Sequence, residues 1–402
     1  MTDELLNYRA QFPILKDTTY LISNSLGAMP HAVYDAAHDY ADTWARRGVR
    51  AWHEGWWDLA KEIGDEIGGL MGAPRSTVSL HTNVTLCQAT VASCFDFTGR
   101  RNKVVYSDLN FPSIMYFWEA QRRTGARVHM VATDGIHVPT DKLLDAIDEE
   151  TLLVPISHVV FRSAYINDAR AIIERAHAVG AHVVLDTFQS LGTVPFDVRD
   201  LDVDFVCGGV LKWLCGGPGV AYLYVRPDLA KKLTPSLTGW AAHVEPFAFE
   251  VGPQRYTDDA YQFMNGTPNV AALYTARPGL KIISEVGIRR IREKSKRQVA
   301  KLIELAEHAG WKVNTPRDPE GRGGTVSIDM PHAKSVCAEL LRRNVIVDYR
   351  PNAGVRMSPH FYTMDDELEV AISAARNIVY EAGAASMPLD LSTGNQGHGL
   401  PR

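Results

Sequence analysis

Residues 186–219, with the sequence DTFQSLGTVPFDVRDLDVDFVCGGVLKWLCGGPG, decide the fold of this 402-residue chain. The apolar run AHVVLD (181–186) ends in Asp186, and the apolar run DFVCGGV (204–210) ends two residues before Lys212. Short apolar runs rich in β-branched residues are typical of strands buried on both faces. An acid therefore ends one predicted strand, and a lysine follows the end of another.

The same pattern extends toward the N-terminus. KVVYS (103–107), RVHMV (127–131) and TLLVPIS (151–157) predict further buried strands. DARAIIERAHAVG predicts a helix between two of the strands, beginning near Asp168 and ending at Gly180. Strands that alternate with helices indicate an α/β fold, with a mostly parallel sheet covered on both faces.

The length of the chain is more than one ordinary domain of ~150 residues needs. The sequence predicts an N-terminal arm and helix that join a small domain (1–56), a large domain (57–270), a smaller α/β C-terminal domain (271–386) and a flexible, polar tail (387–402). Within these segments, residues 1–30 are expected to be extended. A long helical region at about 270–309 is expected to be interrupted at Pro278.

Composition excludes several classes of protein. The chain has 42 basic and 47 acidic residues, a net charge of −5, which is not the basic footprint of a nucleic-acid-binding protein. No apolar stretch reaches the ~18 residues of a membrane helix, and the first residues lack the order of a secretory signal. Five cysteines without a C-x-x-C pair, and histidines without H-E-x-x-H, predict no metal site. We expect a cytoplasmic protein that binds a small molecule.

Asp186 and Lys212 indicate a chemistry. In an open parallel sheet both fall in the crevice at the carboxyl ends of the strands, where ligands bind. A lysine there can form a Schiff base with pyridoxal 5'-phosphate (PLP), and a carboxylate can keep the pyridine nitrogen protonated so that the ring accepts electrons. The alternative is a surface lysine, but glycines at 208, 209, 216, 217 and 219 indicate a close approach of the backbone to something.

Six motifs occur in order along the chain. They are YLISNSLGAMP (20–30), WWDLAKEIGDEIGGLMGA (56–73), Asn110-Phe111-Pro112, SHVVFRSAYIND (157–168), LTGWAAH (237–243) and Gly266-Thr267-Pro268. Together they resemble the class V aminotransferase branch of the fold-type-I PLP enzymes, and most closely the kynureninases. The resemblance implies a large PLP-binding sheet domain, a smaller domain that closes over it, an amino-acid substrate, and a homodimer with active sites at its interface.

The resemblance also implies how the phosphate and the aldehyde are held. Lys212 would be the catalytic residue that holds the cofactor. Thr82 and Asn83 begin a predicted helix, where free N–H groups can cradle a phosphate, although a plain helix cap is an equal alternative. Trp240 and Thr267 would contact the phosphate, from the same or the neighbouring subunit.

Four more residues would surround the ring and the substrate. By resemblance, Phe111 would stack on the pyridine ring, Asp186 would pair with its nitrogen, and Gln189 would reach its phenolic oxygen. Arg356, in AGVRMSP, would hold the substrate α-carboxylate through a two-pronged contact. The alternatives are a core phenylalanine for Phe111 and a strand-edge arginine for Arg356.

The chain departs from the kynureninase pattern at three positions. Leu211 replaces a tyrosine, Ile114 replaces an aspartate, and Gln189 replaces a histidine. The first two replacements remove groups that could act as acid or base. We therefore predict a PLP-dependent enzyme with kynureninase-like cleavage of a β-substituted amino acid at a C–C or C–X bond. A class V aminotransferase, an amino-acid epimerase, or a non-catalytic protein of this fold are the alternatives.

Overall fold

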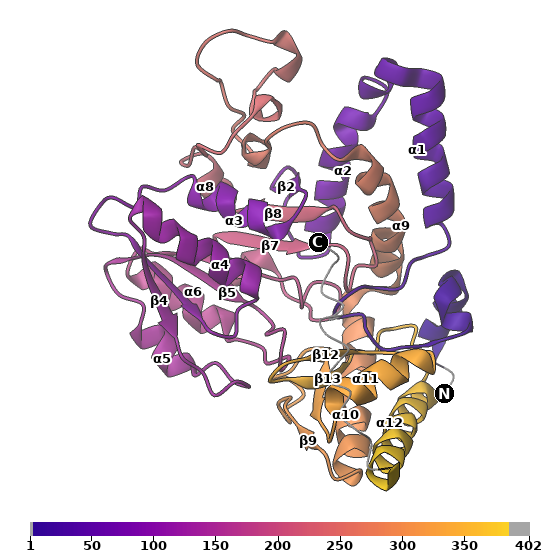
Figure 1. The fold of residues 1–402 in the computed structure, drawn as a ribbon. Helices are drawn as coiled ribbons and strands as arrows, with labels where there is room; N and C mark the ends of the chain where they lie inside the picture. The colour runs from indigo at the N-terminus through magenta and orange to yellow at the C-terminus, as the bar shows by residue number, and fades with distance from the viewer. Residues whose placement is uncertain (1–2, 386–402) are drawn as a thin grey trace.

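A seven-stranded sheet lies at the centre of the computed structural model, which describes residues 3–385 (Figure 1). The strand order is β2-β8-β7-β6-β5-β3-β4. The strands are β2 (Val78–His81), β3 (Lys103–Ser107), β4 (Arg127–Val131), β5 (Thr151–Ser157), β6 (His182–Asp186), β7 (Phe205–Gly209) and β8 (Ala221–Val225). Strands β3 to β7 pair in parallel, whereas β8 is antiparallel to both β7 and β2. The predicted α/β fold with a mostly parallel sheet is confirmed.

Alternate side chains of the strands enter two different cores, because successive residues of a strand point to opposite faces. Val105 and Val183 belong to one cluster, whereas their neighbours Val104 and Val184 belong to another, and all four are fully buried. The first cluster packs against α2 and α6 and the second against α3 and α4. Helices therefore cover both faces of the sheet, as the apolar runs predict.

The helices around this sheet begin and end at recognisable residues. Asp168 caps α6, since its side chain accepts a hydrogen bond from the N–H of Ala171 at 3.0 Å, and Gly180 follows the helix with a left-handed φ of 74°. The α-helices up to α8 are α1 (Val33–Arg47), α2 (Trp56–Gly69), α3 (Val84–Ala92), α4 (Pro112–Ala120), α5 (Thr140–Asp145), α6 (Ala169–Ala178), α7 (Val198–Leu201) and α8 (Pro227–Ala230).

A smaller unit follows, with a core of its own. Its sheet has the order β12-β13-β10-β9, formed by β9 (Lys312–Val313), β10 (Val326–Asp329), β12 (Asp348–Arg350) and β13 (Gly354–Met357). The helices α11 (Ala333–Arg342) and α12 (Asp365–Ala385) pack on it, and apolar residues from 299 to 378 fill the space between them. The core of the large sheet, in contrast, contains apolar residues from 5 to 291, together with Phe361 and Tyr362.

The expected extended arm is wrong in part. Residues Glu4–Gln11 and Pro13–Lys16 form 3-10 helices, and Asp3 caps the first one by accepting a hydrogen bond from the N–H of Leu5. The short strand β1 (Thr19–Tyr20) then pairs in parallel with β11 (Val345–Ile346). The N-terminal segment is thus attached to the smaller unit.

The expected helix break at Pro278 is also wrong. Pro278 lies inside α9 (Val270–Val286), and the break comes at Gly287, before α10 (Ile288–His308). Gly287 has a φ of 84°, a left-handed conformation that ends a helix, whereas a proline removes only one hydrogen bond and need not stop it.

The domain boundaries at 56, 270 and 386 stay predictions, and the tail at 387–402, predicted to be flexible, lies outside the described residues. In the part of the chain that the structure describes, no helix combines the length and apolar character needed to span a membrane.

Candidate active site

Asp186 and Lys212 lie together at the carboxyl edge of the sheet. Asp186 is the last residue of β6, and Lys212 lies in the loop after the neighbouring strand β7. A turn from the N-terminal segment holds this loop, since the N–H of Gly27 donates to the carbonyl of Leu211 at 2.8 Å. A Cβ atom at Gly27 would lie 2.2 Å from the carbonyl oxygen of Lys212, so only glycine allows this approach.

Two aromatic rings contact the amine of Lys212. Its Nζ lies 5.4 Å from the ring centre of Phe111 and 4.2 Å from that of Phe188. Phe111 is exposed and packs edge-on against Phe161 at 5.3 Å. Phe111 was predicted from the sequence, whereas Phe188 was not.

The two adjacent glycines of β7, Gly208 and Gly209, are the feature of the sequence that could have indicated Phe188. A Cβ at Gly209 would lie 2.5 Å from the Phe188 ring, and one at Gly208 would lie 2.2 Å from the hydroxyl of Tyr222. The close approach that these glycines predict is therefore to side chains of the protein itself.

Burial dominates the electrostatics of the acid and the lysine. It raises the pKa of Asp186, against the opposing effects of the Phe188 N–H bond and of the nearby Lys212. Burial also lowers the pKa of Lys212, against the attraction of Asp186. A lysine in these surroundings loses its proton more readily than one on a surface, and a neutral amine is the form that attacks a carbonyl.

Several buried polar atoms at this edge have no hydrogen-bond partner among the described residues. They are both side-chain amide atoms of Asn24, Nδ1 of His81 and Nδ1 of His158. His158 directly follows β5, and its backbone N–H donates to the backbone carbonyl of Asp186. Buried polar groups are almost always paired, so these atoms fit a polar ligand such as PLP. Asn24 and His158 lie in the motifs YLISNSLGAMP and SHVVFRSAYIND, but no role was predicted for either.

The carboxylate of Asp186 has room for the same ligand. Its Oδ1 accepts the N–H of Phe188 at 2.9 Å, whereas no hydrogen bond from the described residues reaches its Oδ2. Gln189 is buried nearby and makes two contacts: its amide donates to the carbonyl of Asn24 at 2.9 Å and its Oε1 accepts from Trp213 at 3.0 Å. One N–H of the Gln189 amide remains for a ligand.

The residues predicted to hold phosphate divide into two places. Thr82 and Thr267 line one small cavity of about 170 Å³, next to His81. Asn83 uses its side-chain oxygen to cap α3, accepting from Leu86 at 3.1 Å.

Trp240, in contrast, packs in an aromatic cluster. Its ring centre lies 4.9 Å from that of Trp57, 5.6 Å from that of Phe247 and 6.1 Å from that of Phe249. The structure therefore places Trp240 with these rings rather than with Phe111 and Phe188 at Lys212.

Arg356 lies on β13 of the smaller unit and is buried. Its guanidinium donates to both carboxylate oxygens of Asp348, at 2.8 and 2.5 Å, and to the carbonyl of Phe161 at 2.7 Å. Phe161 also touches Phe111, so Arg356 connects to the ring that lies over Lys212.

The positions that depart from the kynureninase pattern offer no acid or base. Ile114 is fully buried in the core between α3 and α4, and Leu211 contributes its carbonyl to the turn at Gly27. Tyr222 lies within electrostatic reach of Asp186: its hydroxyl lies 2.8 Å from that of Thr187, and burial raises its pKa well above the ordinary value.

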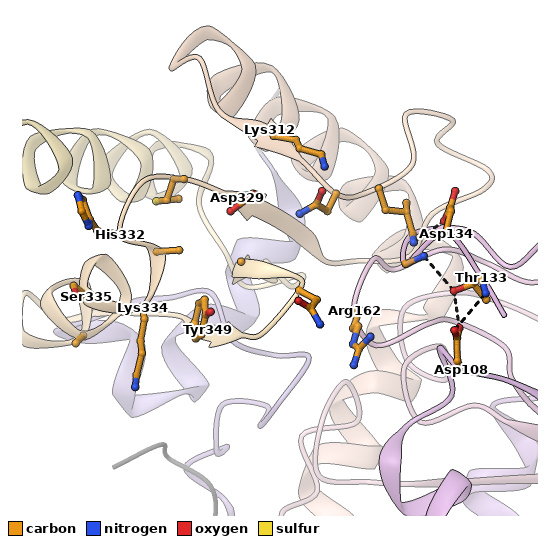
Figure 2. Close-up of a pocket in the computed structure, with 18 residues that line it drawn as sticks. Asp108, Thr133, Asp134, Arg162, Lys312, Asp329, His332, Lys334, Ser335 and Tyr349 are labelled. Atoms are coloured by element: carbon orange, nitrogen blue, oxygen red, sulfur yellow. Dashed lines mark hydrogen bonds between the residues drawn. The ribbon is translucent and has the colours of Figure 1, made fainter. Parts of the chain in front are cut away.

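A separate cavity of about 1030 Å³ lies between loops of the large unit and the smaller unit (Figure 2). Asp108 and Arg162 line it from one side, and Lys312 and Tyr349 line it from the other. None of the predicted site residues is among its lining residues.

Most of the chain matches a known protein family and its members. The family described as Aminotransferase class-V matches residues 19–360. "Uncharacterized aminotransferase YcbU" of Bacillus subtilis (strain 168) is 31% identical over 373 residues, which cover 92% of this chain and 98% of that protein. Kynureninase of Bacillus anthracis is 30% identical over 373 residues, covering 89% of this chain and 87% of that protein.

Solved structures confirm the fold. The apo cysteine desulfurase of Thermococcus onnurineus NA1 superposes with a TM-score of 0.84 at 20% identity, covering 95% of this chain and 99% of that one. The predicted fold-type-I architecture and the resemblance are thus both confirmed: the chain belongs to the class V aminotransferase family.

Proposed function

We propose that the chain is a PLP-dependent enzyme that acts on an α-amino acid and cleaves its β-substituted side chain at a C–C or C–X bond. One observation carries the cofactor assignment: the amine of Lys212 lies against Phe111 and Phe188 at the sheet edge that carries Asp186. When bound there, PLP supplies an electron sink conjugated to the amino group of the substrate.

The residues around this position would have separate roles. Lys212, with its lowered pKa, would hold the cofactor and then accept the α-proton as a neutral amine. The free Oδ2 of Asp186 would accept the pyridine N–H, and the positive charge of that partner favours the ionised carboxylate. The side-chain amides of Gln189 and Asn24 would orient the ring, and Arg356 would hold the α-carboxylate.

The cofactor assignment is tested by colour. Purified protein should show the visible absorption band of a lysine-bound PLP, and Lys212→Ala should abolish it. Lys231→Ala, which changes an exposed lysine, is the matched control and should keep the band. A wild-type protein without the band, or a band that survives in Lys212→Ala, contradicts the proposal and favours a non-catalytic protein of this fold.

The reaction is tested by product. Release of alanine from kynurenine or from β-substituted cysteine derivatives supports cleavage, which the resemblance to kynureninase favours. Formation of a keto acid with conversion of the cofactor to its amine form supports transamination instead, as the aminotransferase relative suggests. Loss of an α-deuterium without either product supports epimerisation.

We also infer that the chain forms a homodimer through the segment between α8 and α9, which projects from the body of the molecule (Figure 1). Val244, Phe249 and Val251 on this segment are exposed, as is part of Trp240. Exposed apolar side chains clustered in this way are typical of an interface. In this dimer, Trp240 of one copy would lie at the phosphate site of the other copy. Light scattering should give twice the monomer mass, and Phe249→Asp should lower it; a monomeric wild type contradicts the inference.

A further inference from the structure

Arg356 is held by protein groups on two sides. Its partner Asp348 lies directly opposite on β12, where the register of the sheet pairs the two residues. Nε and Nη2 of Arg356 donate to the two oxygens of Asp348, and Nη1 donates to the carbonyl of Phe161. These contacts use three of the five N–H groups of the guanidinium.

The two remaining N–H groups define where an anion can bind. One belongs to Nη1 and one to Nη2. Asp348 occupies the face formed by Nε and Nη2, so an incoming carboxylate cannot pair at that two-pronged face. Because Arg356 is almost fully buried, it has little freedom to turn another edge toward the substrate.

A second arginine shares the same acid. Nη2 of Arg350 lies 3.1 Å from Oδ2 of Asp348, and Arg350 is more exposed than Arg356. Residues 348 and 350 share one face of β12, because alternate residues of a strand point the same way. Tyr349, between them, instead lines the large cavity (Figure 2).

The charges of this cluster do not cancel. Two guanidinium groups and one carboxylate leave a single positive charge, which one substrate carboxylate would neutralise. The cluster also acts on the lysine: after burial and the attraction of Asp186, the pKa of Lys212 is lowered by Arg356 and Arg350 and raised by Asp348. The three residues thus lie within electrostatic reach of the reacting amine.

We propose that Asp348 is the positioning residue for Arg356, and that Arg350 supplies the uncompensated charge that draws in the substrate α-carboxylate. This proposal rests on the proposed function, in which Arg356 binds that group. The carboxylate subsite is then a cluster of Arg356, Asp348 and Arg350, rather than a lone arginine.

The two roles predict opposite effects for Asp348→Asn. This variant gains net positive charge, so attraction alone would strengthen the binding of a carboxylate. Loss of positioning weakens it, because asparagine can accept only one of the two N–H groups. We expect weaker binding of about 10- to 100-fold, the effect of losing a hydrogen bond between charged groups. Arg350→Gln should weaken binding by about 10-fold through lost charge.

The probes are L-alanine and ethylamine, which differ in the carboxylate. Each is titrated into the holoenzyme while the absorbance of the cofactor is followed. In Asp348→Asn and Arg350→Gln the apparent Kd should rise for L-alanine and change less than about twofold for ethylamine. Asp348→Glu, which keeps both oxygens, should recover part of the loss and guards against misfolding of Asp348→Asn. Glu307→Gln, which breaks an exposed pair with Arg317 in the same unit, should behave as wild type.

Three results would overturn the proposal: unchanged or tighter binding of L-alanine in Asp348→Asn, an equal loss for ethylamine, or no recovery in Asp348→Glu. Failure of the proposed function looks different. In that case neither probe changes the absorbance of the wild-type protein at all.

Discussion

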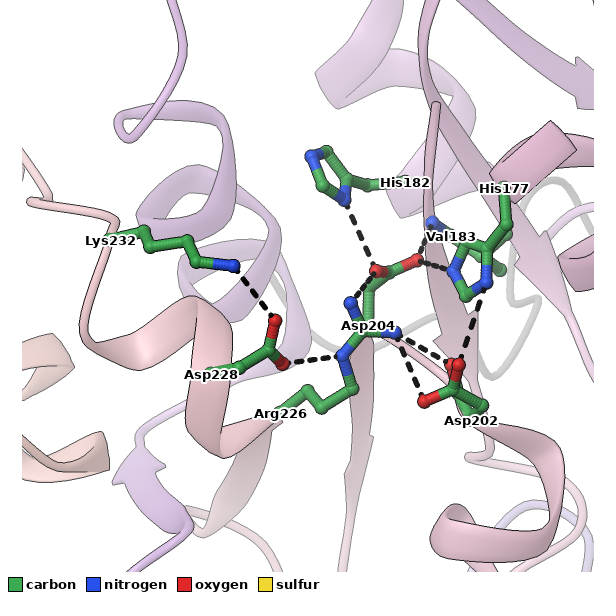
Figure 3. Close-up of polar contacts among 8 residues, drawn as sticks. All are labelled: His177, His182, Val183, Asp202, Asp204, Arg226, Asp228 and Lys232. Atoms are coloured by element: carbon green, nitrogen blue, oxygen red, sulfur yellow. Dashed lines mark hydrogen bonds and ion pairs between the residues drawn. The ribbon is translucent and has the colours of Figure 1, made fainter. Parts of the chain in front are cut away.

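Replacing Asp204 by asparagine tests a polar cluster at the amino-terminal edge of the sheet, opposite the site (Figure 3). The side chain of Asp204 is fully buried just before β7. It accepts hydrogen bonds from His177 at 3.0 Å, from His182 at 3.1 Å and from the N–H of Val183 at 2.8 Å. Arg226 lies 3.4 Å away. The variant removes the charge and keeps the size.

The pKa of the carboxyl group gives the magnitude. Burial alone would raise it, but the bonds from His177 and His182 lower it from 3.8 to about 2. That difference corresponds to about 2 kcal/mol of stability, which is present above the unfolded pKa of about 4 and lost as the pH falls toward 2. Breaking a buried charge pair costs about 3–5 kcal/mol, but Arg226 keeps two other acidic partners. We expect Asp204→Asn to lose about 2–3 kcal/mol at pH 7.

The pH dependence should change as well. The bond to Asp204 raises the pKa of His177, so its contribution is complete below about pH 6.5 and disappears as the pH rises through the folded value. Urea unfolding of the holoenzyme at pH 5.5, 7 and 9 should show this decline in the wild type and a smaller one in Asp204→Asn. Asp202→Asn, which changes an exposed acid beside His177, is the control and should cost less than about 1 kcal/mol. A stability of Asp204→Asn within about 0.5 kcal/mol of the wild type, or an unchanged pH slope, would refute the reasoning.

Three more substitutions probe the site and its frame. Gly27→Ala places a Cβ 2.2 Å from the carbonyl of Lys212, so it should cost about 1–3 kcal/mol in urea unfolding and weaken PLP binding; wild-type values for both would contradict the predicted clash. Gly209→Ala should displace the ring of Phe188 and weaken PLP binding at least several-fold in a fluorescence titration, and unchanged affinity would show that Phe188 is not part of the site. Ile114→Asp, which restores the residue type of kynureninases, should lower stability by about 3 kcal/mol or more, because it buries an unpaired charge; a stable variant with raised activity would contradict this.

The sequence predicted the positions of strands correctly where these depend on the local pattern of apolar residues. Strands β3, β4 and β5 coincide with their predicted ranges to the residue, since β-branched and other apolar residues are frequent in each. The expectation that β4 is buried is wrong, because β4 lies at the edge of the sheet and most of its residues are exposed. Strand β8 received no prediction: it follows a glycine-rich loop and runs antiparallel, outside the strand–helix alternation. Pro278 and Gly287 lie in the same helical region, and the local sequence does not show which of them ends a helix. The break was therefore predicted at Pro278 and missed at Gly287.

The sequence indicated which residues carry the chemistry of the site, but not which residues those side chains contact. Asp186 and Lys212 stand out because each ends or follows a strand. Asn24 could not be derived in the same way, because it lies in the N-terminal segment and reaches the site only through a turn that contacts Gln189. The partner of Arg356 is Asp348 across a strand pair, and sequence spacing does not give that register.

The turn at Gly27 has a consequence for how the protein is made. Ser23, at its start, lies 2.9 Å from the hydroxyl of Tyr362, and the preceding strand β1 needs β11 as its partner. Because a chain leaves the ribosome N-terminus first, all strands of the large sheet are available before these anchors exist. A nascent chain would therefore complete its sheet early and the surroundings of Lys212 last. Capture of the cofactor would then mark the end of synthesis, and a chain stopped before Tyr362 would keep its sheet yet stay colourless.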